Sequence, residues 1–387
     1  MLGYDREKLE TCSALFTASE IAQQPETWLK TSALVQEKKQ EIRDFIDKVV
    51  SQEDFDIIFT GAGTSEFVGN TLYSCLNRKY NYRLKSYATT DIVAAPQLYV
   101  AANKATLLIS FGRSGSSPES IGTIEAVNAV ACQVYHLFIT CNPQGAMAQS
   151  SANYENCLAL VLAPETCDQG FAMTSSFSNM LLCAYLCLTI DEDASGALAA
   201  VATAVRELIE NGHREIHKVI NDFAFQRIVY LGANMFKGIA QESALKMLEL
   251  TAGVVVTMFD TPLGFRHGPK SIIDETTLIV VYLSEDAFTQ KYDIDLITEI
   301  AAQRQGNKIL LLSNKRQPQL DEFVDYHYSF DLPLTINNAL MALNYVVFAQ
   351  MMALFKALAL GITPDNPCPG GAVNRVVKGV VIYPYEK

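Results

Sequence analysis

Apolar runs of strand length alternate with helical patterns through most of this chain. In the first half these runs are FDIIFT (55–60), ATLLIS (105–110), QVYHLFIT (133–140) and CLALVLA (157–163). In the second half they are RIVYLG (227–232), VVVTMFD (254–260), TLIVVYL (277–283) and KILLLS (308–313). Strands that alternate with helices build a parallel sheet with helices on both faces. The pattern therefore predicts an α/β fold.

Long helical patterns accompany these strands. Residues 1–50 have helical spacing, with Pro25 in or just before the first turn of a helix, and further helices are expected over 174–190 and 195–223. The pattern over 334–361 predicts one long helix that stops at Gly361. Its apolar stretch is interrupted by Asn344, Gln350 and Lys356, which favours a buried core helix over a membrane span.

The two halves open alike, which predicts two copies of one module. IIFTGAGTSEFVGNTLY and IVYLGANMFKGIAQESAL each join an apolar strand, a glycine-containing loop and a helix. We expect a helical segment over 1–50, a first α/β domain over 51–200, a second over 215–362 and a tail over 363–387. The loop GAGTSE departs from the GxGxxG of dinucleotide-binding domains, and no acidic residue ends the next strand near Tyr87, which argues against a nucleotide fold.

Composition places the chain among globular proteins and limits its partners. Of its 387 residues, 49% are hydrophobic and 19% are charged, which excludes a mainly disordered protein. A formal net charge of −12 argues against nucleic acid as the main partner. The nine cysteines lack CxxC or zinc-site spacing and lie mostly in apolar runs, and the N-terminus is unlike a signal peptide. We therefore expect a cytoplasmic protein.

Three predicted strand ends are rich in hydroxyl groups and glycines. They are Gly61–Ala62–Gly63–Thr64–Ser65, Arg113–Ser114–Gly115–Ser116–Ser117 and Ala172–Met173–Thr174–Ser175–Ser176. Each lies at a helix start, where free N–H groups and the positive helix end favour an anion. The alternative is that the hydroxyls only cap helices, as Ser117 before Pro118 would. Three such loops on one sheet favour a bound phosphate, with Arg113 as an additional charge.

A second group of residues has the chemistry of proton transfer. Glu242, Lys246 and Glu249 are spaced i, i+4 and i+7, so they share one face of a predicted helix. This face is either exposed to solvent or carries an acid–base set. His267, in the loop TPLGFRHGPKS, is either a surface histidine or a proton carrier near neutral pH. The last candidates, His213 and His217, are spaced like a metal pair without a third ligand, so we interpret them as structural and expect no metal.

Several motifs, taken together and in order, resemble the tandem sugar isomerase (SIS) domains. These are GAGTS, SGSSPES after a strand, ESALKMLEL and FRHGPKSIID. The resemblance runs from about residue 50 to the C-terminus, and LLISFGRSG, GFAMTSS and VNRVVKGVVIYP are similar to the bacterial galactosamine-6-phosphate deaminases, also called tagatose-6-phosphate ketose/aldose isomerases. It implies an α/β fold of two SIS domains, each a parallel sheet with helices on both faces.

The resemblance implies roles for single residues. Phosphate binding falls on the hydroxyl residues of the first two loops, which are Thr64, Ser65, Ser114, Ser116 and Ser117. Gly112 replaces a family serine, and Arg113 compensates for the lost hydroxyl. The third loop resembles a segment that lines the sugar pocket, here with Ala172 and Thr174. The catalytic roles fall on Glu249, with Lys246 beside it, on His267, and on Lys378 in a tail that closes over the active site.

The implied reaction opens the ring of D-galactosamine 6-phosphate and moves the C2 proton to C1. Water then attacks the resulting imine and releases ammonia and D-tagatose 6-phosphate, without a cofactor. In the family the histidine comes from the neighbouring subunit, so we expect a homo-oligomer with shared sites. The alternatives are a simple sugar-phosphate ketose/aldose isomerase or deglycase, and a non-catalytic sugar-phosphate-binding regulator. Such regulators usually carry a DNA-binding segment or lack the glutamate, and this chain does neither.

Overall fold

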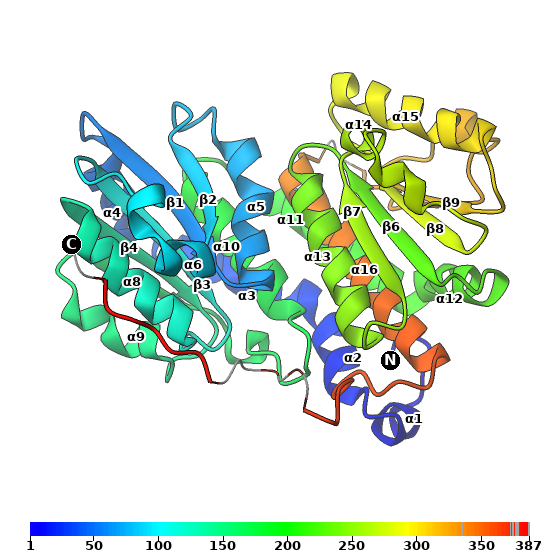
Figure 1. The fold of residues 1–387 in the computed structure, drawn as a ribbon, viewed down its shortest axis with the longest axis horizontal. Helices are drawn as coiled ribbons and strands as arrows, with labels where there is room; N and C mark the ends of the chain where they lie inside the picture. Colours follow the sequence, from blue (N-terminus) through cyan, green and yellow to red (C-terminus); the bar gives the residue numbers. More distant parts are fainter. Residues whose placement is uncertain (334–335, 372, 374, 376–378, 386–387) are drawn as a thin grey trace. The chain divides into compact units, whose positions relative to one another are not determined.

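The computed structural model describes residues 1–333, 336–371, 373, 375 and 379–385. The chain forms two compact units, each built on one sheet (Figure 1). The first unit contains Glu26–Asp168, Ser175–Ser195 and Val373–Lys387, and the second contains Met1–Pro25, Gln169–Thr174 and Gly196–Ala372. Because each unit combines segments that are distant in the sequence, the continuous domains 51–200 and 215–362 stay a prediction.

The first unit holds a five-stranded parallel sheet in the order β2-β1-β3-β4-β5. The strands are β1 (Phe55–Gly61), β2 (Leu84–Ala88), β3 (Ala105–Gly112), β4 (Gln133–Thr140) and β5 (Cys157–Val161). The helices are α3 (Gln24–Glu37), α4 (Lys39–Val50), α5 (Thr64–Leu76), α6 (Thr89–Ala94), α7 (Pro96–Tyr99), α8 (Pro118–Val130), α9 (Ala146–Ser150) and α10 (Ser175–Leu188). Two short 3₁₀ turns are η1 (Ser151–Asn153) and η2 (Pro164–Thr166).

Helices cover both faces of the first sheet. On one face Ile58, Leu108 and Phe138 of the central strands pack against Ile92 of α6 and Ile124 of α8. On the other face α5 lies against β1, and α10 lies against β4. Strands β1 and β3 are buried along their whole length, which explains why their sequences are continuously apolar instead of alternating.

The second unit repeats this plan with a five-stranded parallel sheet in the order β10-β9-β8-β6-β7. The strands are β6 (Arg227–Gly232), β7 (Val256–Asp260), β8 (Thr277–Tyr282), β9 (Lys308–Ser313) and β10 (Tyr326–Ser329). The α-helices are α1 (Arg6–Thr11), α2 (Leu15–Ala22), α11 (Ser195–Glu207), α12 (His213–Asp222), α13 (Phe236–Leu250), α14 (Pro262–Phe265), α15 (Ala287–Ala302) and α16 (Asn338–Ala359). A π-helical turn η3 (Leu208–Gly212) and 3₁₀ turns η4 (Pro269–Ile272) and η5 (Pro318–Leu320) complete it.

The two faces of the second sheet carry different side chains. On one face aliphatic residues of β6, β8 and β9 pack against Leu296 and Ile297 of α15. On the other face Tyr282 stacks between Tyr230 and Tyr345, the latter from α16, with ring centroids 6.1 and 5.0 Å apart. Helix α13 packs against β6, β7 and α16 (Figure 1). The sheet is therefore enclosed, as the sequence predicts.

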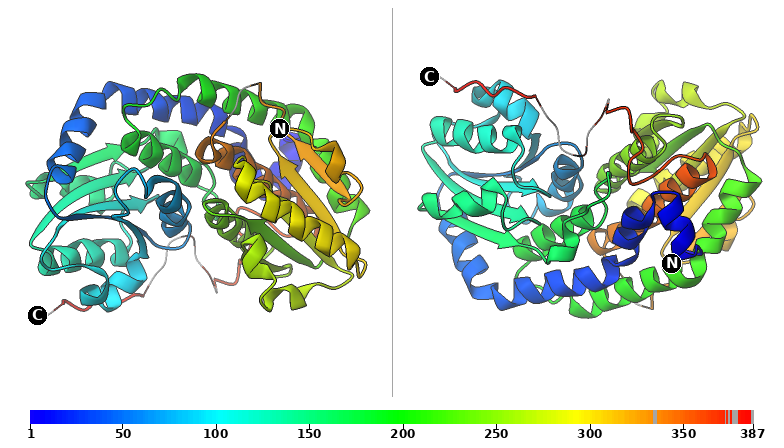
Figure 2. Two further views of the ribbon diagram at one scale, coloured as in Figure 1. Left: turned by 90° about the horizontal axis from the view of Figure 1, so that it is seen from above. Right: turned by 90° about the horizontal axis from the view of Figure 1, so that it is seen from below.

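Helix α16 is long and apolar enough to cross a membrane, but 94% of its most apolar 18-residue window is buried inside the protein. It packs against α12 and α13, and helix α2 lies beside it (Figure 2). Backbone and hydroxyl groups of Thr17 at α2 donate hydrogen bonds of 2.8 and 2.7 Å to Asp365, in the segment that follows α16. The helix is thus the core helix that its polar interruptions predict.

The predicted fold class is confirmed by these two parallel sheets with flanking helices. The helical pattern over 27–50 forms two helices, α3 and α4, because the backbone leaves the helical conformation at Lys38. Strand β10 was not predicted, and its residues YHYS are all half-buried at the edge of the sheet. A short, partly polar edge strand does not give the apolar run by which its neighbours are recognised.

Candidate functional site

The first hydroxyl-rich loop joins β1 to α5 at the carboxyl end of a central strand. Strands β2 and β3 lie on opposite sides of β1, so the order of the sheet reverses here, and ligands of open α/β sheets bind at such a point. A Cβ on Gly61 would lie 2.6 Å from the Ser65 carbonyl oxygen, so the turn requires glycine. Thr64 and Ser65 are consequently held at the helix start, and both are buried.

The second loop joins β3 to α8 and lies at the same edge, because β1 and β3 are adjacent parallel strands. Ser117 is the N-cap of α8, and its Oγ accepts a hydrogen bond of 3.3 Å from the Ser120 N–H. Ser116 is exposed, and its Oγ accepts a 2.9 Å bond from the N–H of Ala146 at the start of α9. The two hydroxyls thus have structural partners, in addition to the phosphate-binding role expected of them.

A neighbouring segment, residues 142–147, fixes the shape of the second loop. The side-chain amide of Asn142 donates to the Ser114 carbonyl at 3.2 Å, and the Met147 N–H donates to the Gly115 carbonyl at 2.8 Å. A Cβ on Gly145 would lie 2.2 Å from the Ser114 carbonyl oxygen. The loop is thus held largely by its backbone, and the half-buried side chain of Ser114 adds one long bond of 3.4 Å, which its Oγ accepts from the Ser116 N–H.

Arg113 is nearly buried, with 7% of its surface exposed, and it contacts the C-terminal tail. Its Nη2 donates a 3.0 Å bond to the carbonyl oxygen of Arg375. Further along the tail, Ile382 packs so closely on α8 that a Cβ on Gly122 would lie 2.6 Å from its Cγ2. The tail therefore docks on the first unit beside the second loop. Lys378, the tail residue with an expected catalytic role, lies outside the described residues.

The third loop is built differently from the first two. The Asp168 carboxylate accepts hydrogen bonds from the N–H and hydroxyl groups of both Ser175 and Ser176, at 2.5–3.1 Å, and so caps α10. The residues before them belong to the second unit, where Ala172 and Thr174 are buried. The Thr174 carbonyl accepts a 3.3 Å bond from Gln350 of α16. Ser175 and Ser176 are therefore capping residues.

The charged residues of α13 form a buried cluster. Glu242 and Lys246 have no exposed side-chain surface, and the Glu249 side chain is 26% exposed. Lys246 Nζ lies 2.5 Å from Glu249 Oε2 and 3.4 Å from Glu242 Oε1. Burial acts to lower the pKa of Lys246, but the two carboxylates outweigh it and raise the pKa, so the ammonium group stays charged.

The interpretation of this face as a solvated surface is wrong. The charges point inward, because α13 packs against α16 on one side and the sheet on the other. The apolar Leu248 of the same helix is instead 42% exposed. Buried charge is costly unless paired, and ionisable groups retained at such a cost cluster at functional sites. Glu249, which reaches the surface and is paired with Lys246, has the arrangement of a positioned base.

His267 lies in a segment that has more structure than the sequence indicates. The segment contains the one-turn helix α14, capped by the Thr261 hydroxyl, and the 3₁₀ turn η4. The histidine lies between these two turns, and it is exposed. Ion pairs hold both sides of it, because Glu299 of α15 contacts Arg266 at 2.7 Å and also contacts Lys270. The segment that the sequence analysis treats as a loop therefore contains two short helical turns.

Two further histidines, His213 and His217, serve packing. The ring of His217 stacks on Phe355 with centroids 4.2 Å apart and an interplanar angle of 5°. His213 lies against Gly3, where an added Cβ would be 2.7 Å from its ring. Within the described part of the chain no group of three or more His, Cys, Asp or Glu side chains is arranged to hold a metal ion.

Sequence reasoning missed three residues that shape these sites. They are Asp168 before α10, Asn142 beside the second loop, and Glu299, which holds the segment of His267. Asp168 precedes Ser175 and Ser176 by seven and eight residues. A side chain that caps a helix is normally recognised within a few residues of the helix start, so this spacing does not mark Asp168. Asn142 and Glu299 act across 28 and 33 residues respectively, so no local pattern marks them.

Comparisons with known proteins give near-full-length similarity. A curated relative from Shewanella sp. (strain ANA-3), a D-galactosamine-6-phosphate deaminase AgaS, is 39% identical over 98% of this chain and 95% of its own length. A candidate tagatose-6-phosphate ketose/aldose isomerase from Clostridium novyi NT superposes with a TM-score of 0.97 at 40% identity, covering 100% of this chain and 99% of the other.

A second solved structure agrees with the first. Tagatose-6-phosphate ketose/aldose isomerase from Escherichia coli gives a TM-score of 0.88 at 35% identity, with 96% of this chain and 97% of the other covered. No protein-family model matches the chain. The resemblance to SIS-type sugar isomerases seen in the motifs is confirmed.

The buried cluster on α13 predicts a large effect of removing its cation. Lys246→Met leaves two carboxylates without their shared partner inside the protein, so we expect a loss of about 3–5 kcal/mol in the free energy of unfolding. Denaturant unfolding of both proteins measures this difference. Lys237→Met, which removes a half-exposed lysine from the same helix, is the matched control and should cost far less. Equal losses for the two variants would contradict the account of the cluster.

Proposed function

This chain belongs to the family of the D-galactosamine-6-phosphate deaminases AgaS, and from that premise we propose that it converts D-galactosamine 6-phosphate and water to D-tagatose 6-phosphate and ammonia. The reaction transfers a proton from C2 to C1 of the opened sugar. The 2-imine that results takes up water at C2 and loses ammonia, which leaves the ketone. No electrons enter or leave the substrate, so acid–base groups suffice and no redox cofactor is needed.

The observation that carries this proposal is the pairing of Glu249 with Lys246. One carboxylate can accept the C2 proton and deliver it to C1, a general base contribution of about 10²–10⁴-fold. The buried ammonium of Lys246, 2.5 Å from that carboxylate, holds it in a fixed orientation. The same ammonium supplies a positive charge that stabilises negative charge developing on the enediol or enolamine.

The 6-phosphate is proposed to bind at the first two loops of the first unit. Their hydroxyls and backbone N–H groups, at the starts of α5 and α8, are donors suited to an anion. The residues assigned this role are Thr64, Ser65, Arg113, Ser114, Ser116 and Ser117. Ala172 and Thr174 are assigned to the sugar pocket, and Lys378 to the closing tail. The docking of the tail through Arg375 and Ile382 supports a closing role.

His267 is proposed to open the sugar ring in a site shared between two subunits. Its exposure and its position on a segment held by Glu299 are consistent with presentation to another chain. We therefore propose a homo-oligomer, built from twofold dimers, in the cytoplasm. In a closed twofold dimer each subunit donates its histidine to the other and receives one in return.

The phosphate role is tested by removing the Ser114 hydroxyl, which contributes one long bond of 3.4 Å to a loop that backbone contacts also hold. Ser114→Ala should raise KM for the sugar phosphate roughly tenfold to hundredfold, because a hydrogen bond to a charged group is worth about 1.5–3 kcal/mol. Adding Ser117→Ala should raise KM further and also lower stability by about 1 kcal/mol, because Ser117 caps α8. Steady-state kinetics and thermal unfolding separate the two effects.

The control for this experiment is Ser150→Ala, which removes a hydroxyl from α9 outside both loops. Its KM should match that of the wild type. An unchanged KM for Ser114→Ala and for the double variant would place the phosphate elsewhere.

The base is tested with Glu249→Gln. The amide cannot accept a proton, so we expect sugar-phosphate binding to persist while kcat falls by about 10²–10⁴-fold. In D₂O the variant should also fail to incorporate solvent deuterium at C1 or C2. Glu275→Gln, an exposed carboxylate of the same unit, is the matched control. A Glu249→Gln chain that keeps more than about a tenth of wild-type kcat would show that another group is the base.

The shared site is tested by complementation. Chains with Glu249→Gln and chains with His267→Ala, each inactive alone, are mixed and allowed to exchange subunits. With shared sites each mixed dimer has one doubly altered site and one intact site, so activity should return to at most about half per mixed dimer. If exchange is verified and no activity returns, the histidine acts within its own chain.

A further inference from the structure

The second unit repeats the strand-end architecture of the first. Strands β7 and β8 lie on opposite sides of β6, as β2 and β3 do around β1, so this sheet has its own reversal point. The turns after β1 and β6 are also alike. A Cβ on Gly232 would lie 2.4 Å from the Phe236 carbonyl oxygen, and the corresponding distance from Gly61 to Ser65 is 2.6 Å. The second unit therefore offers a second place where a ligand can bind.

The side chains at this second place are not those of a phosphate site. Phe236 occupies the position of Ser65, so a hydroxyl is replaced by a buried ring. Helix α15, which follows β8 as α8 follows β3, is capped by the carboxylate of Asp286, whose Oδ1 accepts a 2.8 Å bond from the Thr289 N–H. A carboxylate already occupies the positive end of this helix, which disfavours a second anion there.

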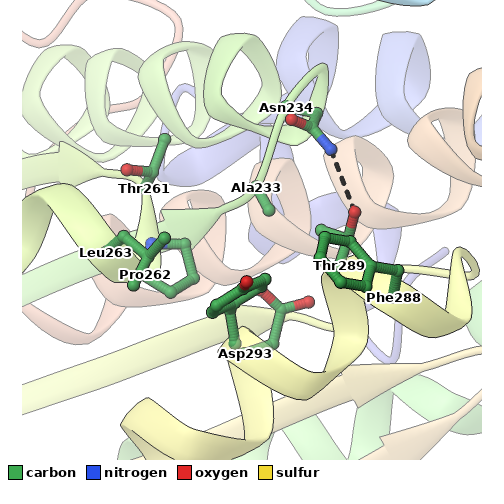
Figure 3. A pocket seen from close by; sticks show the side chains of 9 residues that line it. Ala233, Asn234, Thr261, Pro262, Leu263, Phe288, Thr289 and Asp293 are labelled. Atoms are coloured by element: carbon green, nitrogen blue, oxygen red, sulfur yellow. Dashed lines mark hydrogen bonds between the residues drawn. The ribbon is translucent and has the colours of Figure 1, made fainter.

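A cavity of about 260 Å³ lies at this point, between the loops after β6, β7 and β8 (Figure 3). Its lining consists of Ala233, Asn234, Thr261, Pro262, Leu263, Phe288, Thr289, Tyr292 and Asp293. Most of these side chains are apolar or aromatic, and the Asn234 amide is held by a 3.2 Å bond to Thr289 Oγ1. Phe288 and Tyr292 are 65% and 38% exposed, and their rings meet edge to face at 5.4 Å.

Asp293 is the one lining side chain that carries a formal charge when ionised. Figure 3 shows its carboxyl group among the side chains of Pro262, Leu263 and Thr289. The residue has no exposed surface, and its Oδ2 accepts a 3.0 Å bond from the Ser284 N–H. Its Oδ1 has no hydrogen-bond partner among the described residues. Burial raises the pKa of this carboxyl to about 7, so a partner that supplies positive charge would stabilise its ionised form.

We propose that this cavity binds a small organic ammonium ion, with the ammonium group donating to Asp293 Oδ1 and the carbon body packed against the apolar walls. The chemistry that favours this ligand is a carboxylate with an unmet hydrogen-bond acceptor beside aromatic rings, because rings and carboxylates both attract ammonium groups. A phosphate is disfavoured by the same two carboxylates, Asp286 and Asp293. The site does not depend on the reaction proposed above.

The experiment compares three probes that share one ring and differ in charge. Cyclohexylammonium, cyclohexanol and cyclohexanecarboxylate are titrated against the full chain at pH 8, and dissociation constants are measured by ligand-observed NMR. We expect cyclohexylammonium to bind at least about tenfold more tightly than cyclohexanol, the effect of one hydrogen bond to a charged group. The carboxylate probe should bind most weakly.

Two matched variants on α15 identify the group responsible. Asp293→Asn keeps the shape and can still accept the Ser284 N–H bond, so it should fold and should lose the tenfold preference for the ammonium probe while cyclohexanol binding is unchanged. Asp286→Asn makes the same substitution at the exposed cap, where asparagine caps equally well, and should keep the preference. Thermal unfolding and size-exclusion chromatography confirm that both variants retain the fold and the assembly of the wild type.

Any one of three binding results would overturn the proposal. They are equal binding of the ammonium and carboxylate probes, an unchanged preference in Asp293→Asn, and absence of binding by all probes. Dissociation of an oligomer by Asp293→Asn would also overturn it, because the carboxylate would then pair with a basic side chain of a second copy. Since none of these readouts is turnover, their failure is distinguishable from failure of the proposed function.

Discussion

The position of the first strand in each sheet determines where this protein can bind ligands. Because β1 and β6 are central, with later strands added on both sides, the loops that follow them face the loops after β3 and β8 at one edge of the sheet. Parallel strands place all of these loops at their carboxyl ends. One architecture thus creates two strand-end sites, and the side chains alone decide that the first is rich in hydroxyls while the second contains a buried carboxyl.

The buried charges of α13 are the second constraint. Breaking a buried ion pair costs about 3–5 kcal/mol, a large part of the roughly 5–15 kcal/mol that stabilises a typical domain. The proposed acid–base role gives a reason for keeping Lys246 and its two carboxylates buried at this cost. The segment that carries His267 is fixed by a more exposed network of ion pairs around Glu299. Such a network can hold a side chain at the surface.

Much of the fold could be predicted because parallel strands covered on both faces are continuously apolar, and all eight runs recognised in the sequence contain strands. The edge strand β10 lacks that signal. At the site, Ser117 and Pro118 predicted the start of α8 correctly, since capping is a local interaction. The burial of Lys246 could not be predicted, because it depends on α16, about a hundred residues further along the chain. Asp293 went unnoticed because the cavity beside it is lined by residues of the loops after β6 and β7, which are distant from it in the sequence.

The central claim, that this chain both isomerises and deaminates an amino sugar phosphate, is tested most directly by measuring two products in one reaction. Purified protein is incubated with D-galactosamine 6-phosphate, and with D-glucosamine 6-phosphate for comparison, while ammonia and ketose phosphate are quantified together. The account predicts ammonia and D-tagatose 6-phosphate in equal amounts from the galactosamine substrate. Two results would contradict the account. One is that the protein isomerises only sugar phosphates without an amino group, forming ketose phosphate and no ammonia. The other is that it binds D-galactosamine 6-phosphate without turning it over.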